Sequence, residues 1–250
     1  MGYADLFERN RGILPEDQQE RLRGAHVVMV GCGGVGGTVA TILARTGVGR
    51  FTLIDPDDYE PSNTNRQIGC FADTMGRNKA QVVGEQIEGI NPEARVEAIP
   101  GALPLDEIDA YIAGADLVFP AADDYPYSLM VFRRCRALGK PALLVVPAGY
   151  WATVTLIQPD GPSVEQLHGV PPMESYEDLQ ALLTSFEARL GETFYTTMGG
   201  WDPAYFVDRV EGDAPMAQLC PAVWTASSLG AMEVVKLLSG SARPVSAPRY

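Results

Sequence analysis

The sequence predicts an α/β fold with a mostly parallel sheet, helices on both faces, and an antiparallel or crossover extension toward the C-terminus. Three observations support this class. With 250 residues, 46% of them apolar, the chain can bury a full core. Over the first 150 residues, short β-branched runs alternate with helical patterns, and no repeat interrupts them. A glycine-rich stretch over residues 31–37 joins the first of these runs to a helical pattern.

Each expected element has a local signal. Pro15 opens a short polar helix, Gly47 ends the next one, Pro92 follows the third, and Gly240 can terminate the last. Six apolar runs are expected as strands, at residues 26–30, 51–54, 96–99, 116–119, 142–146 and 153–157. Helices are expected at residues 15–23, 35–46, 79–90, 106–113, 128–138, 176–190 and 222–238.

Charge and composition exclude several classes of function. The chain has 19 basic and 32 acidic residues, a net charge of −13, which repels anionic membranes and disfavours a general nucleic-acid binder, although a single structured RNA is compatible. The charged N-terminus and the lack of long apolar runs predict a cytoplasmic protein. The four cysteines form no CxxC pair, so neither a zinc cage nor a disulfide framework is expected.

The glycine loop indicates a nucleotide site on a Rossmann-like sheet. Its glycines allow a tight turn and a close approach to a phosphate at the start of the next helix. Asp55 ends the second expected strand, where a carboxylate can accept hydrogen bonds from ribose hydroxyls. A nicotinamide dehydrogenase would show both features. The loop glycines expected at the nucleotide are Gly31, Gly33, Gly34 and Gly36.

Four motifs in order carry a family resemblance. GCGGVGG, LIDPDDYEPSNTNRQ, MGRNKA and INP resemble the ThiF/MoeB and ubiquitin-activating adenylyltransferase superfamily over about residues 9–125. The segment Thr64-Asn65-Arg66-Gln67-Ile68 is also similar to bacterial tRNA threonylcarbamoyladenosine dehydratases of that superfamily. The resemblance implies ATP and Mg²⁺ as cofactors, and it implies nucleotide contacts for Asp57, Asn63, Arg66, Gln67 and Lys79.

The residues after Asp55 distinguish ATP from a dinucleotide. A triphosphate needs compensating cations, and Arg66 on a turn with Lys79 at a helix start supplies a fork and a point charge. Arg66 or Lys79 taken alone would be interpreted as a solvated surface cation. Together within the whole motif they favour ATP over a nicotinamide cofactor.

Asp123 follows the fourth expected strand, at the sheet edge where ligands collect. The resemblance assigns it to Mg²⁺, a hard cation that one carboxylate and phosphate oxygens suit. Asp124 is able to share this task, and Pro120 replaces an acid common in relatives, which affects the shape of the loop. Arg11 matches an N-terminal arginine that, in homodimeric members, reaches the neighbouring subunit's ATP site; an exposed basic tail is the alternative.

The second half holds fewer signals. Residues 159–219 contain no cysteine, which argues against a thioester relay within the chain. Cys220 precedes a helix, where its pKa could fall, but packing is the commoner role of a lone cysteine. His26 is expected to be structural and His168 to lie on a surface loop. The aromatic and acidic stretch over residues 173–206 is either an acceptor-binding surface or the packing of a small lobe.

These observations predict one ThiF-type domain with three parts: an ATP-binding, Rossmann-like adenylation unit over residues 1–158, a crossover or substrate lobe over 159–219, and a closing helix over 220–250. The expected protein is a homodimeric adenylyltransferase, catalysing through Arg66, Lys79, Asp123 and Arg11. It would activate the carboxylate of a ubiquitin-like carrier protein or peptide, or act on a modified tRNA base. An NAD-dependent oxidoreductase and a non-catalytic nucleotide-binding partner remain as alternatives.

Overall fold

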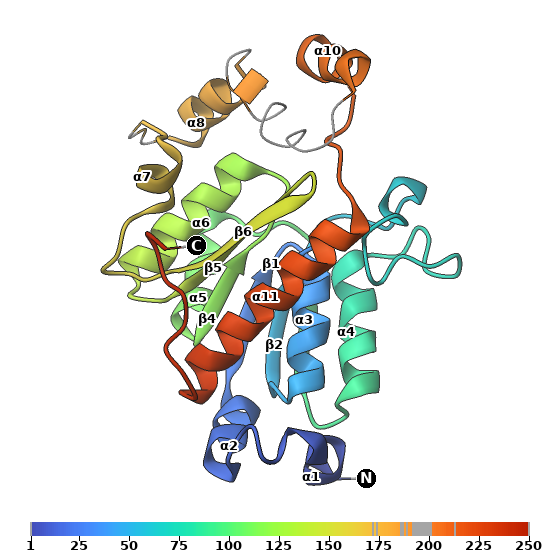
Figure 1. Cartoon of the computed structure of the whole chain (residues 1–250), viewed down its shortest axis with the longest axis vertical. Coiled ribbons are helices and arrows are strands. Elements are labelled where there is room, and N and C mark those ends of the chain that lie inside the picture. The colour runs from blue at the N-terminus through green and yellow to red at the C-terminus, as the bar shows by residue number, and fades with distance from the viewer. Residues whose placement is uncertain are drawn as a thin grey trace.

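The computed structural model describes residues 2–171, 173, 175–185, 188, 190–191, 202–212 and 214–249. Its core is one six-stranded sheet in the order β3-β2-β1-β4-β5-β6 (Figure 1). The first five strands run parallel and β6 is antiparallel to β5, which confirms the predicted fold class. The strands are β1 His26–Val30, β2 Arg50–Ile54, β3 Arg95–Ile99, β4 Leu117–Pro120, β5 Ala142–Ala148 and β6 Trp151–Ile157.

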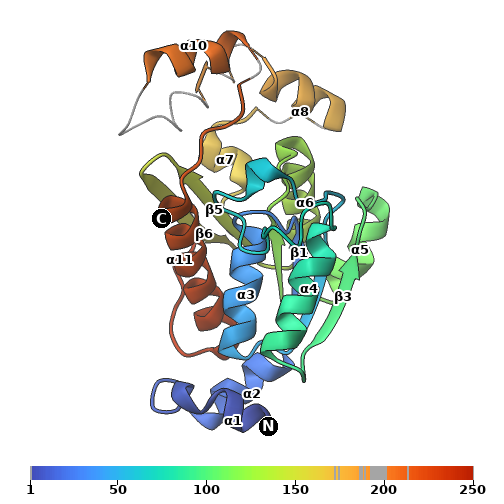
Figure 2. The ribbon, with the colours of Figure 1, turned by 90° about the vertical axis from the view of Figure 1, so that its right-hand side faces the viewer.

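Helices cover both faces of the sheet (Figures 1 and 2). The residues of β1 alternate between the two hydrophobic clusters of the core: Val27 and Met29 belong to one, Val28 and Val30 to the other. Buried on both sides, β1 reads as a continuous apolar run, which is typical of a central parallel strand. The first cluster includes residues of α3 Gly36–Thr46, α4 Lys79–Ile90 and α11 Cys220–Ser239, and the second includes residues of α5 Leu105–Ala113, α6 Tyr125–Ala137, α7 Val164–His168 and α8 Tyr176–Leu183.

Two predicted helices differ from the structure by more than two residues at one end, and the others agree to within two. α6 begins at Tyr125 rather than at residue 128, because the Asp124 carboxylate accepts the N–H of Tyr127 as a cap and Pro126 is tolerated in a first turn. α8 ends at Leu183, short of residue 190, and part of the remainder lies outside the described residues. Among the described residues, the helices α1 Tyr3–Leu6, α7 and α10 Pro203–Glu211 were not expected, nor were the 3-10 helices η1 Glu8–Asn10 and η2 Pro61–Asn63.

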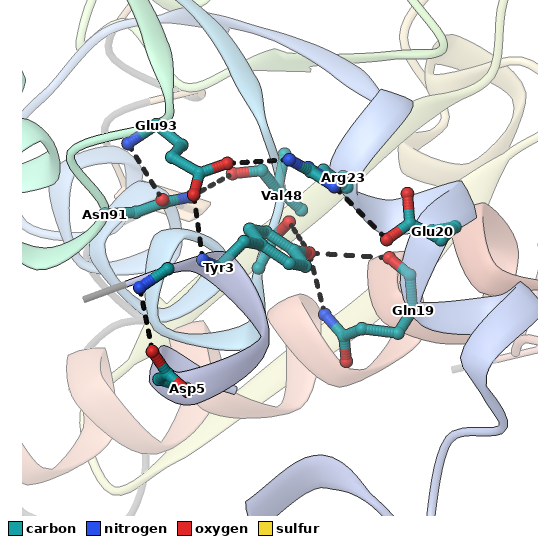
Figure 3. Close-up of polar contacts among 10 residues, drawn as sticks. Tyr3, Asp5, Gln19, Glu20, Arg23, Val48, Asn91 and Glu93 are labelled. Atoms are coloured by element: carbon teal, nitrogen blue, oxygen red, sulfur yellow. Dashed lines mark hydrogen bonds and ion pairs between the residues drawn. The ribbon is translucent and has the colours of Figure 1, made fainter. Parts of the chain in front are cut away.

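A polar network fastens the N-terminal helices to the amino edge of the sheet (Figure 3). The hydroxyl of Tyr3 donates to the carbonyl of Gly47 at 2.6 Å and accepts from the amide of Gln19 at 2.8 Å. The backbone N–H of Tyr3 and the guanidinium of Arg23 bind the two carboxylate oxygens of Glu93, at 2.8 and 2.7 Å. α1 and α2 Glu16–Gly24 are therefore held at the end opposite the carboxyl ends of the parallel strands (Figure 2).

None of the helices in the described part of the chain has both the length and the apolar character that crossing a membrane requires.

We predict that Tyr3→Phe lowers the free energy of unfolding by about 1–2 kcal/mol, because it leaves the carbonyl of Gly47 without its hydroxyl donor. Urea denaturation followed by circular dichroism measures the change. Tyr150→Phe is the matched control: this tyrosine is exposed, and its loss should change stability by less than about 0.5 kcal/mol. Equal midpoints for the two variants would contradict a structural role for the Tyr3 hydroxyl.

Candidate nucleotide site

A pocket of about 310 Å³ lies at the carboxyl ends of β1, β2 and β4. β1 lies between β2 and β4. From β1 the chain adds β2 and β3 on one side and then returns to add β4 on the other side. In open α/β sheets ligands bind in the crevice at such a switch point. The pocket is lined by Val30, Gly31, Gly33, Ile54, Asp55, Pro56, Asp57, Lys79, Ala102, Ala121, Ala122, Asp123, Asp124 and Tyr127.

Three positions of the glycine loop, Gly31, Gly36 and Gly37, leave no room for a side chain, because a Cβ would lie less than 3.0 Å from a backbone oxygen. Gly31 has φ +105°, and a Cβ there would lie 2.5 Å from the carbonyl oxygen of Ala121. A Cβ on Gly36 would lie 2.0 Å from the carbonyl oxygen of Gly31. The loop therefore packs backbone against backbone, and α3 begins at Gly36 without a side-chain cap. A helix start of this kind can bind an anion through its N–H groups.

Asp55 is a buried carboxylate at the pocket wall, only 4% exposed. One oxygen accepts the backbone N–H of Cys32 in the glycine loop at 2.6 Å, and the other accepts the N–H of Asp57 at 2.9 Å. Burial raises the pKa of Asp55, while these two N–H donors and the nearby Lys79 act in the opposite direction. Asp55 thus holds the loop against the end of β2 and lines the pocket. Its contact with a ribose remains a prediction.

Lys79 enters the pocket from the first residue of α4. Its ammonium lies 2.8 Å from a carboxylate oxygen of Asp57, and its side chain is 6% exposed against 59% for Asp57. Asn78 starts this helix by accepting the N–H of Gln81, and its amide donates to the carbonyls of Asp55 and Asp57 at 2.9 and 3.1 Å. The two hydrogen bonds of the Asn78 amide fix the backbone position from which the Lys79 side chain extends into the pocket. A phosphate in the pocket would find a cation that is sheltered from water.

The two acids after β4 have different roles. Asp123 is exposed at the rim of the pocket. Both oxygens of Asp124 are already used: one accepts the N–H of Tyr127 at 3.0 Å and the other the hydroxyl of Tyr176 at 2.7 Å. Pro120 ends β4 opposite Val30 without breaking the parallel register.

The residues present fit a magnesium ion shared with a ligand better than one held by the protein alone. Within the described residues, no group of three or more His, Cys, Asp or Glu side chains is placed to hold a metal. A single carboxylate, that of Asp123, together with phosphate oxygens is the ligand set that Mg²⁺ commonly takes in nucleotide sites.

Asn63 and Arg66 lie on the turn that follows β2, outside the set of pocket-lining residues. The Asn63 side chain closes this turn by accepting the N–H of Glu60 at 3.2 Å. The Arg66 guanidinium donates to the carbonyl of Ser62 at 3.1 Å and to the side-chain oxygen of Asn65 at 2.9 Å. Direct contact of either residue with a nucleotide remains a prediction.

The same turn nevertheless lies against the glycine loop. A Cβ on Gly34 would lie 3.3 Å from Cγ of Arg66, and one on Gly33 would lie 3.6 Å from the amide nitrogen of Gln67. Gln67 is buried, and its side-chain oxygen has no hydrogen-bond partner in the described part of the chain. Both side chains are therefore next to the position that a phosphate would take.

Arg11 lies at the opposite end of the molecule. Its neighbour Asn10 donates to the carbonyl of Thr46, the last residue of α3, at 3.1 Å. The pocket lies at the other end of α3, so Arg11 does not belong to the pocket of its own chain. A role for Arg11 at an ATP site requires a second copy.

Three of the four cysteines are buried, and His26 is buried as predicted for a structural residue. Cys32, Cys70 and Cys135 are buried, and burial raises the pKa of Cys135 to about 12 and that of Cys32 well above its usual value. Cys220 is half-buried at the first residue of α11. His26 bonds to the carbonyl of Gly114 and the hydroxyl of Thr52, and burial lowers its pKa.

His168 is exposed as predicted, but it is the last residue of α7 rather than part of a loop, and its ring bonds to the hydroxyl of Tyr125.

One polar side chain of the pocket was missed in the sequence. Tyr127 lines the pocket, and its hydroxyl donates to the carbonyl of Leu103 at 2.6 Å, which ties α6 to the loop after β3. A signal for it existed, since it follows the candidate metal acid Asp123 by four residues. The predicted helix began one residue after it, so it was not considered.

The chain is similar to several known proteins. The tRNA threonylcarbamoyladenosine dehydratase of Escherichia coli K12 is 40% identical over 135 residues, 54% of this chain and 50% of that protein. The sulfur carrier protein adenylyltransferase of Thermus thermophilus is 38% identical over 140 residues, 55% and 51% of the two chains. The chain thus spans about half the length of the curated relatives it matches.

Solved structures show the same fold over nearly the whole chain. A crystal structure of E. coli MccB with AMPCPP and MccA matches with a TM-score of 0.71 at 25% identity, covering 98% of this chain and 67% of that one. A structure of PaaA matches with a TM-score of 0.68 at 18% identity, covering 96% and 67%. The model of the ThiF family matches residues 7–250, and the chain therefore belongs to the ThiF family.

Proposed function

We propose that the chain is an ATP-dependent adenylyltransferase that converts a carboxylate to an acyl adenylate. The observation that carries the proposal is one pocket that joins the glycine loop, the buried acid Asp55 and the sheltered cation Lys79. The carboxylate oxygen attacks the α-phosphorus of ATP, the bond from that phosphorus to the bridging oxygen breaks, and pyrophosphate leaves. No general base is needed, because an ionised carboxylate is already the nucleophile.

Each residue around the pocket has a task in this reaction. The N–H groups of the glycine loop and the ammonium of Lys79 hold the phosphates, and Asp55 accepts hydrogen bonds from the ribose. Arg66 would keep the two bonds of its Nη1 within its own turn and bind the phosphates through its other guanidinium nitrogens. Asp123 would hold Mg²⁺ together with phosphate oxygens, where the ion supplies charge neutralisation to the departing pyrophosphate. Catalysis is then mainly positioning and electrostatic stabilisation.

The proposed substrate is the C-terminal carboxylate of a ubiquitin-like carrier protein or of a peptide. Support comes from relatives named sulfur carrier protein adenylyltransferase and SAMP-activating enzyme E1, and from the structure of MccB with MccA. ATP as the cosubstrate fits the cytoplasmic location that the sequence predicts.

A second candidate is action on a modified tRNA base. The 40% identity with a tRNA threonylcarbamoyladenosine dehydratase favours it, and so does the segment Thr64-Asn65-Arg66-Gln67-Ile68. The net charge of −13 counts against it, since RNA binding would then need a local basic patch. An NAD-dependent oxidoreductase has less support, because it makes no use of Lys79 or Arg66.

Pyrophosphate–ATP exchange tests the proposed site. With carrier-protein, peptide and modified-tRNA substrates in separate reactions, we expect exchange with at least one class and a loss of about 100-fold or more in Lys79→Ala and Asp123→Ala. Lys236→Ala and Asp73→Ala are matched controls: Lys236 pairs with Glu233 on α11, Asp73 is exposed, and neither lines the pocket. Exchange that survives both pocket substitutions would rule out this assignment.

The proposed dimer has its own test, because Arg11 and Lys79 would meet only between subunits. Arg11→Ala and Lys79→Ala should each be inactive alone. If the two variants are mixed under conditions that exchange subunits, half the dimers carry one site with both residues intact, which restores about a quarter of wild-type exchange. A mixture that stays inactive while subunit exchange is verified would contradict the role of Arg11 in trans.

A further inference from the structure

The first turns of α11 pack against the turn that carries Arg66. The indole N–H of Trp224 donates to the backbone carbonyl of Arg66 at 2.8 Å, across 158 residues of sequence. One residue earlier, Val223 is fully buried, and a Cβ on Gly34 would lie 3.3 Å from its Cγ1. The start of α11 therefore contacts both the glycine loop and the Arg66 backbone.

A second hydrogen bond crosses the same boundary. The Asn65 side chain donates to the carbonyl of Gln218 at 3.0 Å, and its oxygen accepts from the Arg66 guanidinium at 2.9 Å. Trp224 and Gln218 thus hold the backbone and, through Asn65, the side chain of Arg66. Both ties come from the end of the segment over residues 214–219 and from the start of α11.

Core packing does not account for these two hydrogen bonds, Trp224 to Arg66 and Asn65 to Gln218. Trp224 is 41% exposed, and Asn65 is also exposed, so neither fills the hydrophobic core. An Arg fork must be placed within a fraction of an ångström of its anion to bind in two places at once. The stretch between β2 and the turn is fixed by backbone hydrogen bonds to the residues just before α4, such as Tyr59 N–H to the carbonyl of Arg77 at 2.9 Å. The contacts with α11 and with Gln218 just before it are the ones that reach Arg66 and Asn65 themselves.

We infer that Trp224, with Asn65 as a second tie, is a positioning residue for Arg66, and that through it the segment over residues 214–219 is coupled to the nucleotide site. The inference rests on the proposed function, because it takes Arg66 to bind the phosphates. A substrate that contacts residues 214–219 would then alter the affinity for ATP through Arg66, and ATP would alter the affinity for that substrate by the same factor.

A double-mutant cycle tests this inference. The dissociation constant of α,β-methylene ATP is measured by titration calorimetry, with Mg²⁺, for the wild type, Trp224→Phe, Arg66→Ala and the double variant. Trp224→Phe keeps an aromatic side chain but loses the indole N–H donor, so we expect nucleotide binding to weaken by about three- to tenfold. In the Arg66→Ala background the same change should have no further effect, since Trp224 acts through Arg66.

Two more variants complete the experiment. Asn65→Ala should also weaken binding, again only when Arg66 is present, and it keeps the test valid if Trp224→Phe does not fold. Leu229→Ala is the matched control, because it removes a 49% exposed apolar side chain from the same helix; its binding should equal that of the wild type.

The outcomes separate the inference from the proposed function. If Trp224→Phe and Asn65→Ala bind the nucleotide as tightly as the wild type, the inference is contradicted and the proposed function is not. The same holds if the two substitutions weaken binding by the same factor in the Arg66→Ala background as in the wild type. A wild type that does not bind the nucleotide would contradict the proposed function as well.

Discussion

The hydrogen bond between the Asp55 carboxylate and the backbone N–H of Cys32, at 2.6 Å, is the interaction on which the site depends. It joins the end of β2 to the glycine loop, and the second oxygen of the same carboxylate fixes the chain after β2 through Asp57. An unpaired carboxylate this deeply buried would be costly, and its backbone donors offset that cost. With Asn78 bound to the carbonyls of Asp55 and Asp57, the same few contacts also place Lys79.

The sheet provides the frame for these contacts. Because β1 has neighbours on both sides and both its faces are buried, it is fixed in register with β2 and β4. The loops that leave β1, β2 and β4 therefore meet at one edge, and the pocket forms between them. The glycine loop completes the pocket only because Gly31 and Gly36 let its backbone pack closely.

The sequence predicted the strands to within about two residues at most ends, because a buried parallel strand is a short apolar run with sharp limits. It also predicted Asp55, Lys79 and Asp123 at the pocket, since the ends of parallel strands and the start of α4 must gather there. The bounds of α6 and the role of Tyr127 were missed, because Asp124 as a cap and Pro126 in the first turn outweigh the apolar pattern that begins at residue 128.

Other features depend on contacts that no local pattern encodes. The hydrogen bond from Trp224 to the carbonyl of Arg66 joins segments 158 residues apart. The position of Arg11 at the far end of α3 likewise follows from the docking of the N-terminal helices. In each case a motif indicated which residue matters, and only the packing of distant segments showed where its side chain lies.

In the proposed function this glycine loop, together with Lys79 and Arg66, binds ATP rather than a dinucleotide. The most direct measurement is competitive titration calorimetry of the full chain with MgATP and NAD. We predict that MgATP binds at one site per chain and that NAD, at about ten times the ATP concentration, does not displace it. Saturable binding of NAD with no binding of MgATP would contradict the account.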